Sequence, residues 1–493
     1  MSNPSLKRAL GLYATTALVI GSVVGSGIFS SPSQMARDLP SAPYLMGVWV
    51  LTGVLTLFGA FTQCELVGQM PKTGGLYEYF REVYGEGLGF LYGWANFMIA
   101  GSGAIAAISF FFAQYFENFT ALPHFTHALT FLGVTENTPG NIPFLGAIFP
   151  YQFLGRKLVA SFLVVFLTAL NVRGVKLGGM VQSISTTAKM LAILAIVLVA
   201  FIAGSHVGHV SNWSQVGTPG TSLLGWPLIG AVALAMSGAF WSYDGWGNAA
   251  YIAGEVREPQ KTIPKAIILG TLTFIGLYLV VNLAYFYILS VTGVANAPGD
   301  RVASQMVFAV VGSGGAGIIA VIMMLSAFDT TNSTVLTNAR VYYAMARNGL
   351  FVRKGAEVHE KFQTPHIALI LQGAWSIILL VTGSFDLIVS MYVFVNWVLY
   401  ALMAVAVFIL RKRKPDAERP FSVPGYPWVP AIFVLFASAY VIITLVTDIQ
   451  AYQAGTQPLI RSVTGMALVL TGLPFYYYWR WKRRAETEKG TSS

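Results

Sequence analysis

The sequence predicts an all-α polytopic membrane protein of about twelve transmembrane helices. Of its 493 residues, 55% are hydrophobic and only 10% are charged, a composition that one or two water-soluble cores do not accommodate. Apolar stretches of the roughly 20 residues that cross a bilayer recur along the whole chain. Two of these stretches, the first and the sixth, are interrupted by short glycine-rich or polar segments, which predicts broken helices and a buried polar site.

The predicted spans follow one another through mostly short linkers. The first six lie near residues 12–36, 43–70, 87–118, 155–172, 178–204 and 222–254. The next six lie near residues 265–292, 308–338, 366–384, 386–410, 429–447 and 458–478. The linker 119–152 is the longest and is rich in Pro, Gly, Asn and Thr. We expect it to cap one face of the protein or to carry short helices.

Basic residues mark one side of the membrane. They collect in alternate linkers and at both ends of the chain, from Lys7 and Arg8 to the cluster 480–489. The opposite linkers hold only Arg37, Arg156, Lys157, Arg301 and Arg461. The positive-inside rule therefore predicts a multi-pass protein of the plasma (inner) membrane with both termini cytoplasmic. The net charge of +10 is explained by topology and by anionic lipid headgroups, and we expect no nucleic-acid partner.

Little in the sequence favours an enzyme. The first apolar stretch continues past Phe29 without a cleavage pattern, so we expect it to remain as a helix. The only cysteine, Cys64, lies in the second span, which excludes an intramolecular disulfide. The chain has no His-Glu-x-x-His motif, cysteine nucleophile or intramembrane Ser/His/Asp set. An intramembrane enzyme or a channel is thus the least supported function class, and we expect neither a metal nor a cofactor.

The first break comprises Gly25, Ser26, Gly27 and Ile28. Glycine leaves no side chain between a ligand and the peptide groups, and free N–H groups at the start of a half-helix attract anions. We therefore expect a substrate carboxylate at the N–H groups around Ser26, Gly27 and Ile28, with the Ser26 hydroxyl as a further donor. Close helix packing through small residues is the alternative interpretation.

The second break lies in the sixth span, where Trp241, Ser242, Tyr243 and Asp244 precede Gly245. An unwound turn there leaves carbonyl oxygens free to accept from an ammonium group. A site for a carboxylate and a site for an ammonium group together predict an α-amino acid. A carboxylate in mid-membrane costs about 2.5 to 3.5 kcal/mol on insertion scales and marks a functional position by default. Asp244 can contact a cationic side chain or, as we favour, cap the second half-helix.

Three further polar residues lie inside predicted spans. Lys189, in the fifth span, is about 20 Å along the helix from Lys176 at the cytoplasmic end, which is far for snorkelling. We expect Lys189 to bind backbone carbonyls of the broken first helix, where a sodium-coupled transporter places its cation. Glu65 and Asp329 are either proton carriers or hydrogen-bonded packing residues, and we favour packing.

Several motifs give the chain a family resemblance. It resembles the amino acid–polyamine–organocation (APC) superfamily, and within it the bacterial relatives of the L-type amino acid transporter (LAT) exchangers. The matching segments are Gly21-Ser22-Val23-Val24-Gly25-Ser26-Gly27-Ile28-Phe29, Pro71-x-x-Gly74-Gly75-x-Tyr77, Gly93-Trp94, Ser242-Tyr243-Asp244-Gly245-Trp246, Glu255 with Pro259 and Pro264, Asn282-Leu283-Ala284-Tyr285, Arg340, and Asn396-Trp397. The match runs from about residue 8 to 425, and the last two helices align by hydropathy alone.

The resemblance implies an architecture. It implies an inverted repeat of five plus five helices with discontinuous helices 1 and 6, followed by two C-terminal helices. The first repeat would occupy residues 1–204 and the second residues 222–410, with helices 11 and 12 and a basic tail in 411–493.

The resemblance also implies roles for single residues. Ser26 and Gly27 would hold the carboxylate, carbonyls near Trp241–Tyr243 the amino group, and Trp241 would act as a gate. Lys189 at the family's lysine position implies sodium independence. Tyr285 would close the inner side around the first helix. Phe394 and Asn396 would border the side-chain pocket. Animal members pair with a single-span glycoprotein through a cysteine in the third-to-fourth loop, which is absent here, so no disulfide-linked heavy subunit is expected.

Two transport hypotheses follow from the sequence. The first is a sodium-independent exchanger of neutral L-amino acids that works by alternating access. The alternative is proton-coupled uptake of cationic amino acids, with Asp244 recognising the extra charge.

Overall fold

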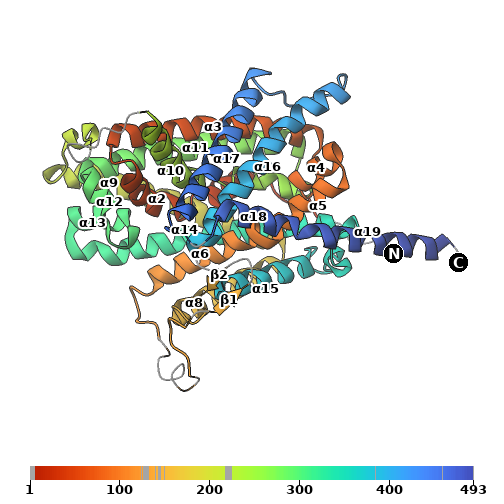
Figure 1. Ribbon diagram of the computed structural model, residues 1–493, viewed down its shortest axis with the longest axis horizontal. Coiled ribbons are helices and arrows are strands. Elements are labelled where there is room, and N and C mark those ends of the chain that lie inside the picture. The colour runs from red at the N-terminus through yellow and green to blue at the C-terminus, as the bar shows by residue number, and fades with distance from the viewer. Residues whose placement is uncertain are drawn as a thin grey trace.

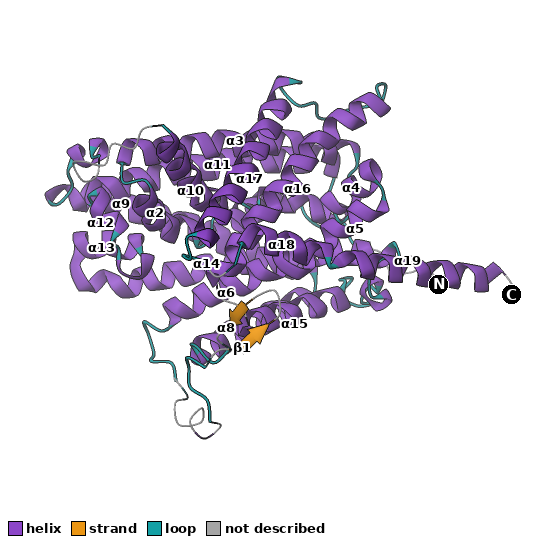
Figure 2. Ribbon diagram, viewed as in Figure 1, coloured by secondary structure: helices purple, strands orange, loops and turns teal. Residues whose placement is uncertain are grey.

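The computed structural model describes residues 6–491 except 124, 126–130, 132, 139, 143–145, 149, 217–224, 383–384 and 458. Long helices run mostly along the longest axis of the molecule (Figures 1 and 2). The two termini lie at the same end, beyond which the last helix, α19, projects (Figure 1). This arrangement confirms the all-α membrane class.

The first half of the chain contains one broken helix and several continuous ones. The helices are α1 (Leu12–Val23), α2 (Gly27–Asp38), α3 (Ala42–Gln69), α4 (Leu76–Tyr84), α5 (Glu86–Ala95), the π-helical turn η1 (Asn96–Ala100), α6 (Gly101–Phe116), α8 (Leu154–Val172), α9 (Val175–Ile202), and the 3₁₀ segments η2 (Ala203–His206) and η3 (Val210–Ser214).

The second half begins with the other broken helix. Its helices are α10 (Trp226–Tyr243), the 3₁₀ segment η4 (Trp246–Glu255), α11 (Pro259–Ile288), α12 (Val291–Ala295), η5 (Pro298–Asp300), α13 (Val302–Val311), η6 (Gly312–Gly315), α14 (Ala316–Arg347), η7 (Arg353–Ala356), α15 (His366–Thr382), α16 (Phe385–Arg413), α17 (Trp428–Gln453), α18 (Arg461–Leu470) and α19 (Gly472–Thr491).

Each of the twelve predicted spans coincides with a helix or with a helix pair. Nine helical stretches of the described chain are long and apolar enough to cross a membrane by length and composition. The other three predicted spans do not contain one continuous helix of that length, each for an identifiable reason. The sixth breaks after Tyr243, α15 has only 17 residues, and the twelfth is divided into α18 and α19 at Thr471.

The two broken helices lie together in the centre of the molecule. The half-helix α2 packs against α10, and α1 packs against α9, α11 and α14. Further pairs enclose this centre, because α3 packs on α11, α6 on α14, and α8 on α15. The irregular backbone is therefore surrounded by other helices, as a membrane requires.

The structure differs from the sequence expectations in two elements. The linker 119–152 contains a short antiparallel hairpin of β1 (Gly140–Ile142) and β2 (Gly146–Ile148), in which Asn141 pairs with Ala147. The eighth helix, α14, begins only at Ala316, because the separate helix α13 ends at Val311 and its C-cap residue Gly312 has a φ of +69°, which favours glycine. An apolar window does not distinguish α13 from the start of the following span.

Candidate functional site

The break in the first helix exposes peptide N–H groups. After Val23 the chain bends through Val24, Gly25 and Ser26 before α2 begins at Gly27. The backbone N–H groups of Ser26, Gly27 and Ile28 donate to no protein atom among the described residues. The Ser26 hydroxyl is also buried without a hydrogen-bond partner. Unpaired donors at the start of a half-helix form a site for an anion.

The break in the sixth helix lies directly against the first. The helix α10 ends at Tyr243, and the chain turns at Asp244 and Gly245, where Gly245 has a φ of +103°. A Cβ atom added to Gly27 would lie 2.6 Å from the Cα of Ser242, and one added to Gly245 would lie 2.8 Å from the Ser22 carbonyl oxygen. Only glycine permits these approaches, so both glycines hold the two breaks face to face.

Tyr278 on α11 joins the two breaks. Its buried hydroxyl lies 3.0 Å from the Val23 carbonyl oxygen and 3.0 Å from the Ser242 carbonyl oxygen. The single hydroxyl proton can serve either acceptor. Tyr278 thereby couples the ends of α1 and α10, one from each broken helix.

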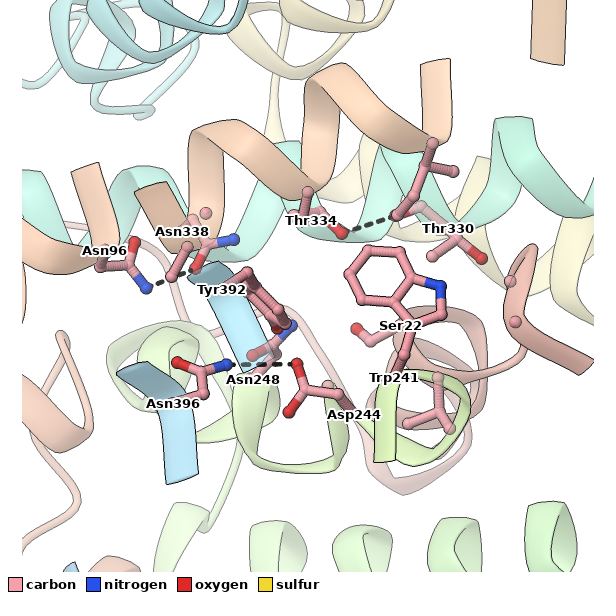
Figure 3. A pocket seen from close by; sticks show the side chains of 18 of the residues that line it. Ser22, Asn96, Trp241, Asp244, Asn248, Thr330, Thr334, Asn338, Tyr392 and Asn396 are labelled. Carbon is pink, nitrogen blue, oxygen red and sulfur yellow. Dashed lines mark hydrogen bonds between the residues drawn. The ribbon is translucent and has the colours of Figure 1, made fainter. Parts of the chain in front are cut away.

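A cavity of about 50 Å³ lies between the breaks and helices of the third, eighth and tenth spans (Figure 3). Of the predicted site residues, Gly25, Ser26, Gly27, Trp241, Asp244 and Asn396 line it. The volume is well below the roughly 300–1,000 Å³ of ordinary small-molecule sites, so a larger ligand enters only when the lining helices move apart.

Asp244 faces the cavity and is held by α16. Its carboxylate accepts hydrogen bonds from the Tyr400 hydroxyl at 2.6 Å and from the Asn396 amide at 3.4 Å. The 3₁₀ segment η4 begins at Trp246, and its N-cap residue, Gly245, has no side chain that could cap it. Donors from a distant helix thus hold the carboxylate, and the favoured interpretation of Asp244 as a cap of the second half-helix stays a prediction. The sequence alone gave no sign of the Tyr400 contact.

Trp241 closes one end of the cavity together with Tyr392 of α16. The two rings meet edge to face, with centroids 5.4 Å apart and planes at 85°, a favourable aromatic geometry. Figure 3 shows the indole and the Tyr392 ring beside the cavity, across from Asn396 and Asp244. The role of Trp241 as a gate stays a prediction.

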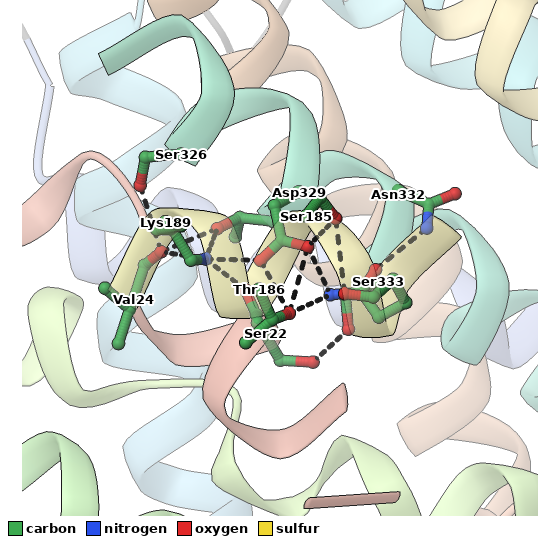
Figure 4. Close-up of polar contacts among 12 residues, drawn as sticks. Ser22, Val24, Ser185, Thr186, Lys189, Ser326, Asp329, Asn332 and Ser333 are labelled. Carbon is green, nitrogen blue, oxygen red and sulfur yellow. Dashed lines mark hydrogen bonds and ion pairs between the residues drawn. The ribbon is translucent and has the colours of Figure 1, made fainter. Parts of the chain in front are cut away.

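Lys189 on α9 lies beside Val24 at the first break (Figure 4) and does not line the cavity. Its Nζ donates to the Val24 carbonyl oxygen at 2.5 Å and lies 2.6 Å from a carboxylate oxygen of Asp329 on α14. Both side chains are 0% exposed. The Val24 carbonyl also accepts from Ser326 at 3.1 Å and from Thr330 at 3.0 Å. The cluster ties α9 and α14 to the bend in the first helix.

Asp329 is saturated with hydrogen bonds. It accepts from Gln182 at 2.8 Å, from Ser185, and from Thr186 at 2.9 Å, in addition to its ion pair with Lys189. Glu65 accepts from Arg411 at 2.6 Å and from the Val423 N–H at 2.8 Å. Buried carboxylates with a cation and several donors fit the packing interpretation better than that of a proton carrier.

Two predicted residues lie outside the cavity lining. Tyr285 contacts α2, with its hydroxyl 3.4 Å from the Ile28 carbonyl oxygen. It lies near the C-terminal end of α11, and its role in helping to close the inner side around the first helix stays a prediction. Phe394 is buried on α16 but does not line the cavity. The face of α16 that does so repeats every four residues at Tyr392, Asn396 and Tyr400.

Three other predicted residues surround the cavity without lining it. Ile28, Ser242 and Tyr243 are buried next to the breaks. Sequence reasoning missed cavity residues on several helices, including Asn96 and Ala104 of the third span, Thr330, Thr334 and Asn338 of α14, Asn248 and Tyr251 of η4, and Tyr392 and Tyr400 of α16. A π-helical turn at Asn96–Ala100 is a local sign of a functional position, but no sequence pattern predicted it.

Comparisons with known proteins agree with this geometry. The family model described as amino acid permease matches residues 10–469. The chain is 33% identical to the serine/threonine exchanger SteT of Bacillus subtilis, over 97% of this chain and 98% of that one. It is 28% identical to the mouse large neutral amino acids transporter small subunit 2 (97% and 82% covered) and 26% identical to the mouse b(0,+)-type amino acid transporter 1 (97% and 89% covered). The paired helix breaks, the enclosed cavity and the near-complete family match lead to one conclusion: this chain belongs to the amino acid permease family of the APC superfamily.

Proposed function

We propose that this protein is a sodium-independent exchanger of neutral L-amino acids that works by alternating access across the plasma membrane. The observation that carries the proposal is the pair of facing helix breaks, with the unpaired N–H groups of Ser26, Gly27 and Ile28 at one of them. These groups suit a carboxylate, and carbonyl oxygens at the end of α10 suit an ammonium group. The serine/threonine exchanger in Bacillus subtilis supports exchange of this substrate class.

Sodium independence rests on Lys189. An ammonium nitrogen 2.5 Å from the Val24 carbonyl oxygen occupies the place where a cation would bind the bend of the first helix. A sodium ion needs the same carbonyl oxygens, and a fixed positive charge beside them repels it. The protein therefore carries its own cation at this position.

The membrane setting follows the sequence. We place both termini in the cytoplasm on the distribution of basic residues, and the two termini lie at one end of the molecule (Figure 1). The only cysteine is buried in α3, so a heavy subunit linked by a disulfide is not expected. The packing of α3 on α11, α6 on α14 and α8 on α15 supports repeats at residues 1–204 and 222–410, since these are corresponding helices.

Counterflow in proteoliposomes tests the proposal. Vesicles loaded with an unlabelled neutral amino acid should take up labelled amino acid without sodium, and vesicles loaded with buffer alone should not. Replacing sodium by choline should leave the rate unchanged. Uptake that requires external sodium, or that is equally fast into empty vesicles, would contradict exchange without sodium.

Asp244 in the cavity favours proton-coupled uptake of cationic amino acids as a second candidate. Against it stand the two hydrogen bonds by which Tyr400 and Asn396 already engage the carboxylate. An imposed pH gradient, inside alkaline, separates the two candidates in vesicles without internal substrate. Accumulation of lysine or arginine driven by this gradient would support the second candidate, and no accumulation would support exchange. Membership of the permease family disfavours an enzyme or a channel.

A further inference from the structure

The cavity is much longer than the backbone of one amino acid. On α14 its lining extends from Thr330, next to the first break, to Asn338, and on α16 it extends from Tyr392 to Tyr400. Eight residues of α-helix span about 12 Å. The carboxylate and ammonium sites lie at the breaks, toward the end where Trp241 and Tyr392 meet. Other lining residues, Asn338 on α14 and Asn248 and Tyr251 on η4, lie farther along their helices, toward the C-terminal ends, than Thr330 and Gly245 beside the breaks.

The far end of the cavity is lined by amides with unused hydrogen-bonding capacity. Asn338 is 3% exposed. Its Oδ1 accepts from the Asn96 amide at 3.2 Å, while its own Nδ2 donates to no atom of the described residues. The side chain of Asn248 also lines the cavity and has no hydrogen-bond partner among the residues described. Figure 3 shows Asn338 bonded to Asn96, with Asn248 at the same cavity.

The nearby polar groups are already committed to protein partners. Asn96 Oδ1 accepts from the Tyr342 hydroxyl at 2.7 Å, and the hydroxyls of Tyr92 and Tyr251 bind each other at 2.6 Å. Thr334 donates to the Thr330 carbonyl oxygen of its own helix at 2.8 Å. Asn338, which is buried, and Asn248, which is partly buried, thus keep donors to spare, and a buried unpaired amide is costly unless a ligand or water satisfies it.

We infer that Asn248 and Asn338 form a side-chain subsite that selects amino acids with a long, uncharged, hydrogen-bonding side chain, of which glutamine is the type. The inference rests on the proposed function, because the α-carboxylate and α-amino groups must first be held at the two breaks. A terminal carboxamide both donates and accepts, and so it complements two asparagine amides. An apolar side chain of the same length displaces water and leaves both amides unpaired, which is the basis of strong discrimination.

The test compares substrates of matched length. Glutamine and methionine have unbranched side chains of similar length, and only glutamine carries a carboxamide. In wild-type proteoliposomes we expect kcat/KM for glutamine to exceed that for methionine by about tenfold or more. Equal values for the two substrates would overturn the inference. So would a preference for arginine over glutamine, because Asp244 and not the amides would then dominate the pocket.

Variants assign the preference to the two asparagines. Asn248→Leu, whose side chain has no protein partner to lose, should reduce the preference for glutamine over methionine to near unity. Asn338→Leu should do the same, and Asn248→Leu carries the test if loss of the Asn96 contact disturbs folding. Thr337→Val is the matched control, because Thr337 lies next to Asn338 on α14, donates its hydroxyl to the Ser333 carbonyl oxygen of the same helix at 2.8 Å and does not line the cavity; this variant should keep the preference. The ratio of kcat/KM for alanine to kcat/KM for serine should be the same in the wild type and in all of these variants, since short side chains do not reach the subsite.

The outcomes separate the subsite from the proposed function. A wild-type protein that exchanges no amino acid refutes the proposed function. If the wild type exchanges amino acids but Asn248→Leu loses glutamine transport and methionine transport to the same extent, only the subsite is refuted.

Discussion

At the scale of single residues, the most informative side chain is Lys189. It is fully buried, it pairs with Asp329 at 2.6 Å, and it binds the Val24 carbonyl at the bend of the first helix. Removing one partner of a buried ion pair leaves an uncompensated charge, which costs about 3–5 kcal/mol. The pair therefore stabilises the fold and also fixes the position of the break.

Lys189→Met should lower both thermal stability and transport, whereas Lys189→Met combined with Asp329→Asn should recover much of the stability and little of the transport. The double variant removes the lone buried charge but does not restore the contact with the Val24 carbonyl. Melting temperature in detergent and counterflow at matched protein content measure the two effects. Lys176→Met, an exposed lysine on the same helix, is the control. Normal counterflow in either Lys189 variant would refute a positioning role.

Trp241→Ala should weaken closure of the cavity. The edge-to-face contact with Tyr392 is worth about 0.5–1.5 kcal/mol beyond area burial, so KM should rise about two- to tenfold for small substrates, and bulkier amino acids should become accepted. Counterflow with a panel of neutral amino acids checks this. Tyr392→Phe keeps the ring and should behave as wild type. If Trp241→Ala accepts the same amino acids as the wild type with the same KM values, Trp241 is not a gate.

At the scale of elements, a second buried ion pair holds the C-terminal halves of the sixth and eighth helices together. Glu255 at the end of η4 meets Arg340 of α14 at 3.0 Å, with side chains 1% and 0% exposed. The Glu255 carbonyl oxygen also accepts from the N–H groups of Ala9 at 2.9 Å and Leu10 at 3.0 Å. The segment before α1, η4 and α14 thus form one joint at the end of the molecule where the chain termini lie.

Arg340→Met should destabilise the protein by about 3–5 kcal/mol, because Glu255 is left charged and buried. The combined variant with Glu255→Gln should be less destabilised than Arg340→Met alone. Thermal unfolding in detergent gives the comparison. If the combined variant is at least as destabilised as Arg340→Met alone, Glu255 and Arg340 are not coupled.

The exposed pair Lys414–Glu82, at 2.7 Å with side chains 54% and 37% exposed, is the matched contrast. The hydrogen bond from Lys414 lowers the pKa of the Glu82 carboxyl. Because the pKa of Glu82 is lower in the folded state than in the unfolded chain, the ion pair stabilises the folded state at pH values above the ordinary glutamate pKa. This stabilisation is lost as the pH falls through the lowered pKa of the folded state. Lys414→Ala should therefore cost no more than about 1 kcal/mol at neutral pH and nothing at strongly acidic pH, as measured by unfolding at both pH values.

At the scale of the whole molecule, the chain termini share one end, and long helices enclose two broken ones (Figure 1). A C-terminal fluorescent protein should mature and fluoresce, and a C-terminal alkaline phosphatase should be inactive, because the positive-inside rule puts this end in the cytoplasm. Fusion to the linker 119–152 should reverse both results. Phosphatase activity of the C-terminal fusion would contradict the predicted cytoplasmic position of the C-terminus.

The sequence by itself determined the membrane class, the twelve spans, the positions of both breaks and the family. Each of these depends on local composition or on a contiguous motif, such as the glycines around Ser26 or the apolar length of each span. Tertiary structure alone decided which distant groups meet. The Lys189–Asp329 pair, the Tyr400 hydrogen bond to Asp244 and the amides Asn248 and Asn338 come from helices far apart in the chain. Helix packing and rotation bring such side chains together, and hydrophobic periodicity does not encode which polar residues of different helices face each other across a cavity.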